Sequence, residues 1–323
     1  MANVVNTTLS SGTGNDLSPA MQTYYDRKMI TDMKPKLVHY QYGQKRPLPK
    51  QNGKQVQFRK WTPFAAATTA LTEGVVPDGQ ALSMTAVNAT VKQYGGYVTV
   101  TDMLDMTALD PVVNDSVELM ADQGALSIDT LTRDVIVAGT NVIYGSKPDG
   151  SVAVSRSAVT SDHKLSSLEL RKAVRLLKKN KAPRFMRGGK GYFVAIVSPD
   201  VVFDLQNDQT WLDVSKYQES EAIFSGEIGR LFGVIVVESP EAKIFKNMGA
   251  GGTTDVAATL VMGKDAYGVI DLEGENVRAI VKNRGSAGTA DPLEQISTVG
   301  WKALGYAAAI LQNGWMVRIE TGL

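Results

Sequence analysis

The sequence predicts a mixed α+β fold in which an N-terminal arm leads into a long hairpin, a long helix and a compact α/β unit. Three observations support this fold class. Residues 1–60 contain only nine Leu, Ile and Val residues, residues 113–135 repeat apolar side chains at helical spacing, and short apolar runs typical of strands follow residue 190. At 323 residues, the chain can hold one large domain or two moderate ones.

The N-terminal arm is not expected to fold by itself. Its prolines interrupt any long helix or central strand, and its few apolar residues bury too little surface to offset the entropy of ordering. The prolines are Pro19, Pro35, Pro47 and Pro49, and the aromatic residues from the arm to the start of the hairpin are Tyr24, Tyr25, Tyr40, Tyr42, Phe58 and Trp61. We expect these aromatic side chains to anchor the arm on the same chain or on a neighbouring copy.

Charge is distributed in blocks along the chain. Residues 27–60 carry ten basic residues and one acid, a net charge of +9, whereas residues 61–140 carry two basic residues and ten acids, a net charge of −8. Complementary blocks of this kind suit the packing of one copy against the next. The alternative is that the blocks are separate solvated faces.

Composition excludes several classes of protein and site. The chain has no cysteine, so it has neither a disulfide framework nor a Cys-based zinc site. The sequence contains no run of about eighteen apolar residues, so we expect no membrane span. Residues 1–9 lack the basic start and the apolar core of a secretory signal. A net charge of +1 argues against a dedicated nucleic-acid-binding protein.

The hairpin is predicted from two strand-like segments. Residues 55–61 begin with a strand alternation, and Val87, Ala89 and Val91 share one face of the return strand. Residues 62–86 between them are rich in Ala, Thr and Gly and contain a turn at residues 76–79. Because such a hairpin has almost no core of its own, we expect it to need a partner surface.

The long helix is predicted to begin at Pro111, with Asp110 as its N-cap, and to end near Gly139. A short strand at residues 97–101 precedes it. Its apolar stripe, at steps of three or four residues, consists of Val113, Val117, Met120, Gly124, Ile128, Leu131 and Val135. Roughly 28 residues at about 1.5 Å each give a rod about 40 Å long.

The C-terminal half predicts a compact α/β unit. A loop at residues 145–161 is followed by a helix at residues 163–181 that packs through Leu170, Ala173, Val174 and Leu177. Strands are expected at residues 192–198, 231–238, 259–262, 268–272 and 277–282, a helix at residues 199–206 and a flexible loop at residues 249–254. Residues 299–311 and 315–320, joined by Gln312, Asn313 and Gly314, predict a closing hairpin.

No constellation of residues predicts catalysis. His39 and His163 have neither metal-ligand spacing nor the pattern of a triad, and we expect each to have an ordinary surface or capping role. No phosphate-binding loop occurs, and residues 249–254 lack the last glycine of a dinucleotide-binding fingerprint. We therefore predict no catalytic, cofactor-binding or metal-binding residue and no enzyme. A soluble enzyme working through carboxylates alone is the remote alternative.

Residues 171–190 form a second basic block, with nine Lys or Arg and no acid. Such a block could contact phosphates through counterion release. The interpretation we favour from the sequence is the polar face of an amphipathic helix that docks on an acidic neighbour.

The order of these elements resembles the major capsid protein of tailed bacteriophages, which has the Hong-Kong-97-type fold. Residues 71–83 and 91–102 are similar to the extended-loop signature and return strand of the N-four-type phage capsids. Residues 129–141 resemble the end of their spine helix, residues 226–238 a stretch of phage capsid axial domains, and residues 291–301 with the closing strands their C-terminus. The resemblance covers about residues 15–323.

The resemblance implies four parts. Residues 1–54 would be the N-terminal arm, residues 55–93 the extended loop that reaches over a neighbour, residues 94–160 and 285–323 the peripheral domain with the spine helix, and residues 161–284 the axial domain. The contacts between subunits are expected at Arg59, Lys60, Trp61, Glu73, Asp78 and Arg230. No Lys lies within residues 62–86, so we expect no covalent crosslink of the kind that some relatives form.

The resemblance also implies a function. Copies of the chain would assemble in the bacterial host cytoplasm, as pentamers and hexamers, into the icosahedral shell around a phage double-stranded DNA genome. A scaffolding protein, a portal and a decoration protein are the expected partners, with non-specific contact to packaged DNA, no membrane and no cofactor. The alternative is an encapsulin-like compartment, which predicts a cargo peptide and no portal.

Overall fold

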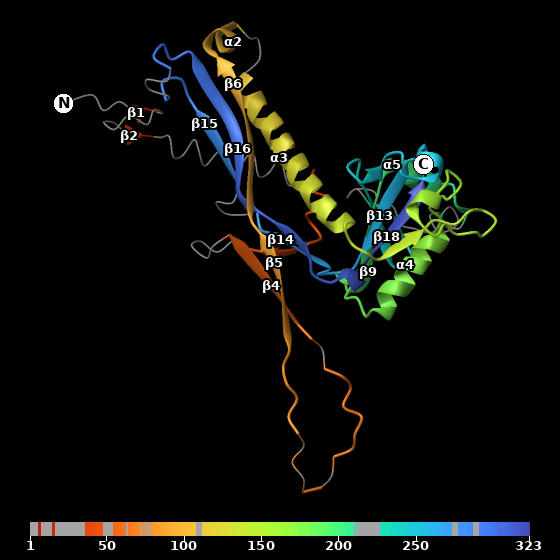
Figure 1. The fold of residues 1–323 in the computed structure, drawn as a ribbon. Helices are drawn as coiled ribbons and strands as arrows, with labels where there is room; N and C mark the ends of the chain where they lie inside the picture. The colour runs from red at the N-terminus through yellow and green to blue at the C-terminus, as the bar shows by residue number, and fades with distance from the viewer. Residues whose placement is uncertain are drawn as a thin grey trace.

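The computed structural model describes residues 6–7, 15–16, 36–47, 54–62, 64–71, 73–74, 76, 78–107, 112–209, 211, 227–272, 277–286 and 291–323. These residues form an elongated half, a compact half and a projecting hairpin (Figure 1). In the elongated half, helix α3 (Val112–Val137) runs beside strands β6 (Lys92–Thr101), β15 (Val277–Lys282) and β16 (Ile296–Tyr306). The C-terminus lies in the compact half (Figure 1).

Helix α3 packs against the sheet β15–β16–β6, which is antiparallel throughout. Its buried face contains Val117 and Ile128, as the predicted stripe requires, but also Ala121, Ala125 and Ile136. Three members of the predicted stripe, Met120, Leu131 and Val135, are only partly buried, and the side chain of Val113 lies outside the described residues. The helix turns its alanines inward because small side chains allow it to lie close to the sheet. The predicted cap at residues 110–111 also lies outside the described residues.

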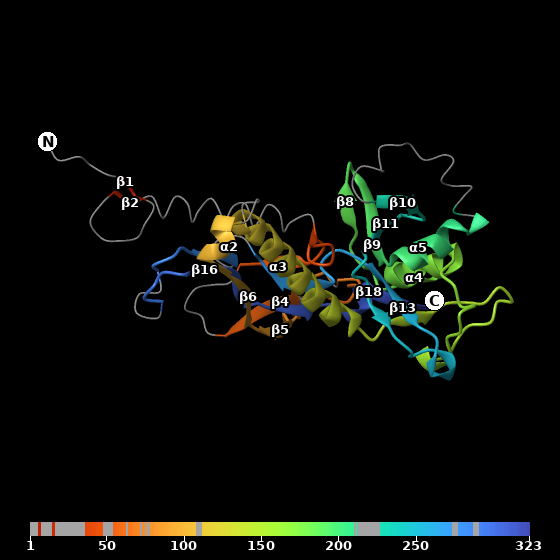
Figure 2. The same ribbon diagram turned by 90° about the horizontal axis from the view of Figure 1, so that it is seen from above.

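The compact half is built on one mixed sheet in the order β10–β11–β9–β13–β18–β7, with β12 paired to β13 and β8 paired to β9. Its strands are β7 (Val142–Tyr144), β8 (Phe185–Arg187), β9 (Lys190–Val197), β10 (Glu227–Leu231), β11 (Val234–Glu238), β12 (Ile244–Phe245), β13 (Val256–Met262) and β18 (Met316–Gly322). Figure 2 shows β8, β9, β10 and β11 beside helix α5 (Pro199–Gln206).

Both faces of this sheet are covered. Helices α4 (Ser167–Lys179) and α5 pack on one face with Ala195, Val261 and Val317, whereas Ile196 and Met262 on the other face join the core that contains α3. A strand buried on both faces reads as a continuous apolar run rather than an alternating one. This is why the runs at residues 192–198 and 259–262 are recognisable as strands in the sequence.

Helix α4 buries the four residues predicted for it, Leu170, Ala173, Val174 and Leu177. It begins later than predicted, after an N-cap at Ser166 that forms a capping box with Glu169. The box satisfies backbone N–H groups that the first turn would otherwise leave free. His163 therefore precedes the helix rather than starting it.

The predicted closing hairpin is wrong. Residues 296–306 form β16, Ala308–Ile310 form β17, Asn313–Trp315 form a 3₁₀ turn, η6, and the final strand β18 lies between β13 and β7 in another sheet. Asn313 does not serve a two-residue turn. Its Oδ1 accepts from the backbone N–H of Thr140, and its Nδ2 donates to Thr140 Oγ1. Tertiary contacts at the end of α3 thus determine the path of the chain here.

The run at residues 231–238 is also divided differently from the prediction. Phe232 and Gly233 both have positive φ, which turns the chain between β10 and β11. Two residues with positive φ suit a tight hairpin between twisted strands. The remaining strands differ from their predicted bounds by a few residues, apart from β6, which begins five residues earlier than expected at Lys92.

A third sheet, β17–β14–β3, joins the two halves. Strand β14 (Tyr267–Ile270) pairs with β17 and, in parallel, with β3 (Gln44–Arg46) from the arm. Beside it lies the hairpin of β4 (Gln55–Trp61) and β5 (Met84–Thr90). The remaining elements are β1 (Asn6–Thr7), β2 (Asn15–Asp16), α2 (Asp102–Thr107), η2 (Arg156–Ala158) and η4 (Ala250–Gly252).

Strand pairing crosses the domain bounds expected from the sequence. Strand β18, expected in the part with the long helix, lies inside the eight-stranded sheet of the compact half. Conversely, β15, expected with the compact α/β unit, pairs with β16 in the elongated half. The two halves are therefore each assembled from segments distant in sequence.

Candidate subunit-contact surfaces

The base of the hairpin β4–β5 has a small core of its own. Val56, Phe58 and Ala89 are buried against Ile270 of β14 and Ala307, which lies between β16 and β17. Val87 and Val91 pack on the same cluster, so the three residues predicted to share a face of the return strand do so. The base is therefore fixed to the body of the chain.

A glycine makes this seat possible. A Cβ atom at Gly268 would lie 2.4 Å from Cε1 of Phe58, closer than any real contact. The ring of Phe58 occupies the space over β14 that a side chain would fill. Because Gly268 of β14 has no side chain, Phe58, which lies 210 residues earlier in the sequence, can pack there and hold the hairpin in place.

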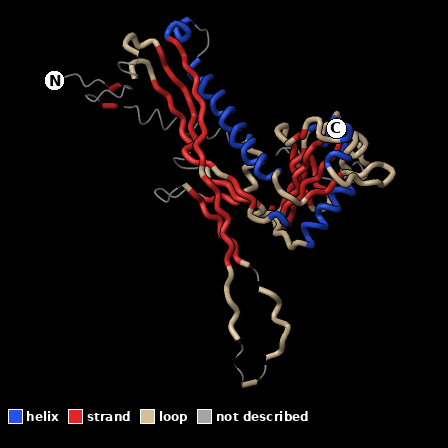
Figure 3. Tube along the Cα trace, in the orientation of Figure 1, coloured by secondary structure: helices blue, strands red, loops and turns tan. Residues whose placement is uncertain are grey.

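Beyond its base, the hairpin carries exposed apolar side chains. Figure 3 shows this tip as loop beyond the ends of the strands. The exposed residues are Trp61, Phe64, Leu71, Val76, Leu82 and Met84, with Val76 90% exposed. Single exposed apolar residues are ordinary, but six on one loop form a surface that suits contact with another chain.

Five of the six residues predicted to contact other subunits lie on this hairpin. Arg59 and Trp61 are exposed on one face of β4, whereas Lys60 points to the opposite face and is partly buried. Glu73 and Asp78 are exposed near the tip. The sixth, Arg230, is exposed on β10 at the edge of the compact half, away from the hairpin (Figure 2). Of the exposed apolar residues, sequence reasoning named only Trp61, although Leu71, Val76 and Leu82 are visible as isolated apolar positions in a polar loop.

The end of the arm is anchored on the same chain. His39 Nδ1 lies 2.6 Å from Asp129 Oδ2, and the backbone N–H groups of His39 and Tyr40 donate to Asp129 Oδ1 at 2.7 and 3.2 Å. The hydroxyl of Tyr267 donates to the carbonyl oxygen of His39. At the surface, Lys36 pairs with Asp122 of the same helix.

The anchor of the arm is deeply buried. His39 and Asp129 are 0% and 1% exposed, so the expectation of a surface or capping role for His39 is wrong. The carboxylate of Asp129 can be buried here because it accepts hydrogen bonds from two backbone N–H groups and faces the imidazole of His39. Burial raises the pKa of Tyr267 well above its ordinary value, so its hydroxyl remains a donor. The arm and the long helix are thus held together by a polar node, although the sequence showed only aromatic anchors.

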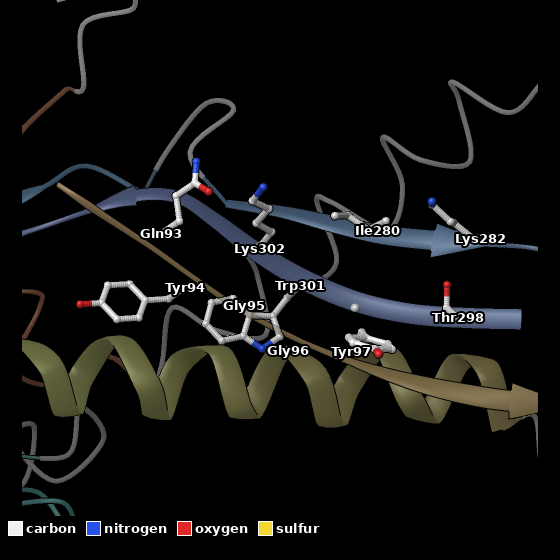
Figure 4. A pocket seen from close by; sticks show the side chains of 11 residues that line it. Gln93, Tyr94, Gly95, Gly96, Tyr97, Ile280, Lys282, Thr298, Trp301 and Lys302 are labelled. Carbon is white, nitrogen blue, oxygen red and sulfur yellow. The ribbon is translucent and has the colours of Figure 1, made fainter. Parts of the chain in front are cut away.

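The outer face of the sheet β15–β16–β6 forms a groove of about 500 Å³ (Figure 4). Gly300 lies between Ile280 and Tyr97 on the neighbouring strands, and a Cβ atom there would lie 2.8 Å from Cβ of Tyr97. Lys282 and Lys302 point away from α3 at its rim (Figure 4). These three strands contain no acidic residue. The groove therefore combines an apolar floor with positive charge.

The second basic block forms an exposed face on α4 and the β8–β9 hairpin. Of its nine basic residues, only Lys172 is partly buried, and its Nζ lies 3.4 Å from Glu169 Oε1. The guanidinium groups of Arg171 and Arg184 lie over the rings of Phe232 and Phe193, at 5.3 and 5.5 Å from the ring centroids. The predicted amphipathic helix is confirmed, with its basic residues on the solvent side.

The described residues contain no cluster of three or more His, Asp or Glu side chains arranged to hold a metal ion. His163 is also buried, at 3% exposure, so a surface role is wrong for it as well, and its Nδ1 accepts from the backbone N–H of Thr160 at 2.9 Å. Within the same part of the chain, none of the helices combines the length and the apolar character needed to cross a membrane.

Comparison with known proteins identifies a family. The family model described as phage capsid protein matches residues 84–319 of this chain. No curated protein matches the chain.

Solved structures show the same fold. The capsid of Ralstonia phage GP4 has 14% sequence identity and a TM-score of 0.69, with 87% of each chain covered. The capsid of cyanophage P-SCSP1u has 15% identity and a TM-score of 0.64, with 87% of this chain and 86% of that chain covered. The capsid of cyanophage Pam1 has 16% identity and a TM-score of 0.61, with 90% and 92% covered. The expected α+β capsid fold is confirmed for the chain as a whole.

Proposed function

The chain belongs to the phage capsid protein family, and from this premise we propose how its surfaces act in a shell. It is a major capsid protein, a structural and non-enzymatic component of the virion, and copies of it form the icosahedral head. The observation that carries this conclusion is the family match over residues 84–319 on a chain that has the capsid fold.

Within the family, we propose that the chain is of the N-four type. The support is in the sequence, in the loop signature at residues 71–83 and its return strand at residues 91–102. The fold is of the Hong-Kong-97 type, in which α3 is the spine helix and the hairpin β4–β5 the extended loop. The compact half is the axial domain, and the elongated half is the peripheral domain.

Strand pairing supports domain bounds that differ from those expected from the sequence. The axial domain takes β18 from the C-terminus, because β18 pairs with β13 and β7. The peripheral domain takes β15, because β15 pairs with β16. Residues 36–47 of the arm belong with the spine helix, to which they are anchored at Asp129.

The extended loop contacts a neighbouring copy. The six exposed apolar residues of the tip support this proposal, since nothing in the described part of their own chain covers them. Arg59 and Trp61, which share the exposed face of β4, are the contact residues on that strand, and Glu73 and Asp78 are those near the tip. Arg230 contacts a neighbour from the edge of the axial sheet.

Charge complementarity supports contact between basic and acidic blocks of adjacent copies. Part of this complementarity is already satisfied within one chain, where Lys36 pairs with Asp122 on the spine helix. Reversing the charges of Arg59 and Lys60 is expected to impair assembly more than folding. Normal shells from that variant would contradict the proposal.

The shell is built from pentamers and hexamers in the bacterial host cytoplasm, with a scaffolding protein, a portal and a decoration protein as partners and packaged double-stranded DNA inside. Many modest contacts for each subunit add up through avidity. No isopeptide crosslink forms through the tip of the loop, because residues 62–86 contain no Lys.

Negative-stain electron microscopy with light scattering on the purified protein tests the proposed function. We expect closed shells, or rings of five and six subunits. A small species that stays monodisperse across salt and concentration, even when a scaffolding protein is coexpressed, would overturn it. Shells that form around a cargo protein and lack a portal vertex would indicate an encapsulin-like compartment instead.

A further inference from the structure

We propose that the basic face formed by α4 and the β8–β9 hairpin is the surface of this protein that contacts the phosphates of packaged double-stranded DNA. This face is defined by Arg171, Lys172, Arg175, Lys178, Lys179, Lys181, Arg184, Arg187 and Lys190. The inference rests on the proposed function, because only a capsid protein encloses a genome, and it assigns that contact to one surface.

The geometry of α4 concentrates positive charge on one side. Arg171, Arg175, Lys178 and Lys179 follow at helical spacing, within about 12 Å along the axis at 1.5 Å per residue. The opposite side of the helix is fully committed to the core, with Leu170 and Leu177 at 0% exposure. The charged side chains are exposed and therefore project outward from a rigid support.

Five of the nine basic residues have no ion-pair partner among the described residues. Arg175, Lys178, Lys179, Lys181 and Lys190 make no ion pair with any residue that the structure describes. The single acid of α4 is Glu169, which is buried at the first turn and bonded to Ser146, Ser166 and Lys172. It does not offset the basic residues of the second and third turns.

This arrangement has an energetic cost for the isolated chain. Like charges four residues apart on a helix, such as Arg171 with Arg175 and Arg175 with Lys179, destabilise the helix. The helix dipole favours cations only in the last turn, where Lys178 and Lys179 lie, and not at Arg171 near the first turn. A polyanion outside the chain relieves this repulsion.

The composition of the face favours nucleic acid over a protein partner. Protein interfaces are depleted of Lys and centred on apolar or aromatic residues. Here five of the nine basic residues are Lys, and the two aromatic rings near the face already carry Arg171 and Arg184. The groove on the sheet β15–β16–β6, whose floor includes the exposed Tyr97 and the partly buried Ile280, is the contrasting case and suits a peptide better.

The test measures binding of unassembled protein to a 20-base-pair DNA duplex by fluorescence anisotropy at several salt concentrations. The variant Arg175→Gln, Lys178→Gln, Lys179→Gln should bind more weakly and should lower the slope of log affinity against log salt by about 3, or about 1 per lost phosphate contact. The matched control is Arg278→Gln, Lys282→Gln, Lys302→Gln, which removes the same charge from the peripheral sheet and should leave the slope unchanged. A variant that keeps the charge, Arg175→Lys, Lys178→Arg, Lys179→Arg, should bind like the wild type.

The outcomes separate this inference from the proposed function. Equal slopes for the α4 variant and the wild type would overturn the inference, and so would an equal loss in the matched control. An α4 variant that binds DNA normally but no longer forms shells would assign this face to an acidic protein neighbour instead. Failure of the wild-type protein to form shells, judged by microscopy, would count against the proposed function whatever the DNA result.

Discussion

The eight-stranded sheet and the extended hairpin use apolar residues in opposite ways. In the sheet, side chains on both faces of β9 and β13 are buried by helices, by the arm and by neighbouring strands. In the hairpin, only the base is buried, while six large apolar side chains of the tip are exposed. The difference shows that the sheet is stabilised within one subunit, whereas the hairpin tip is left uncovered by the described part of its own chain, and we propose that a second subunit covers it.

The largest expected effect tests the junction between the arm and the body. Asp129→Ala should lower the free energy of unfolding by about 3–5 kcal/mol, because it leaves His39 and two buried backbone N–H groups without their acceptor. Asp122→Ala on the same helix is the control and should cost at most about 1 kcal/mol, since its pair with Lys36 is exposed. Urea unfolding of unassembled protein measures the free energy of unfolding of both variants. Equal losses of free energy would show that the buried contacts of Asp129 stabilise the protein no more than the exposed pair does.

The next effect tests the core of the sheet. Leu177→Ala should cost about 2–5 kcal/mol, because Leu177 is fully buried between α4 and the sheet and truncation leaves a cavity. Leu168→Ala on the same helix should stay within about 0.5 kcal/mol, since Leu168 is 47% exposed. If the two variants unfold at the same urea concentration, the assignment of the buried face of α4 is wrong.

A smaller effect tests the seat of the hairpin. Gly268→Ala should cost about 1–3 kcal/mol, because the added methyl group forces the ring of Phe58 away from β14. Adding Phe58→Val should recover part of the loss by making room. Urea unfolding gives the free energies, and limited proteolysis shows whether the hairpin has become accessible. If Gly268→Ala is as stable to urea and as resistant to proteolysis as the wild type, the packing of Phe58 on Gly268 is contradicted.

The ion pairs that Asp134 makes at the surface with Arg133 and Lys243 should make stability depend on pH in acid. Burial alone would raise the pKa of Asp134, but hydrogen bonds from Lys243 and Arg133 outweigh it and hold the pKa below its ordinary value of 3.8. The pair therefore contributes stability above about pH 4, and this contribution is lost as pH falls through the lowered folded pKa. Asp134→Asn should remove this part of the acid dependence and cost at most about 1 kcal/mol at neutral pH. Identical unfolding curves between pH 2 and pH 5 would argue against the pair.

The smallest expected effect on stability belongs to the tip of the hairpin. Leu71→Ser, Val76→Ser, Leu82→Ser together should change the free energy of unfolding by about 0.5 kcal/mol or less, because these side chains are exposed. The same variant should fail to form shells, which microscopy and light scattering detect. Thr68→Ser, Thr69→Ser on the same loop is the control and should assemble normally. Normal shells from the first variant would remove the tip from the assembly contacts.

Much of the local structure could be predicted from the order of the residues alone. The helical spacing of Leu170, Ala173, Val174 and Leu177 fixed the buried face of α4, and the uninterrupted apolar runs identified the doubly buried strands. The sequence also indicated the capsid family, through the order of elements and the signatures at residues 71–83 and 91–102. These features depend on neighbours within about one turn or one strand, so local patterns report them.

Tertiary structure alone decided how distant segments meet. The Asn-Gly pair at residues 313–314 predicts a hairpin locally, but Thr140 binds Asn313 and the final strand enters the eight-stranded sheet instead. Likewise, the sequence places Asp129 among several acidic residues of a helix, whereas in the fold its Oδ2 lies 2.6 Å from Nδ1 of His39. Non-local hydrogen bonds and burial outweigh turn propensities of about a kilocalorie per mole, and no pattern within a short window encodes them.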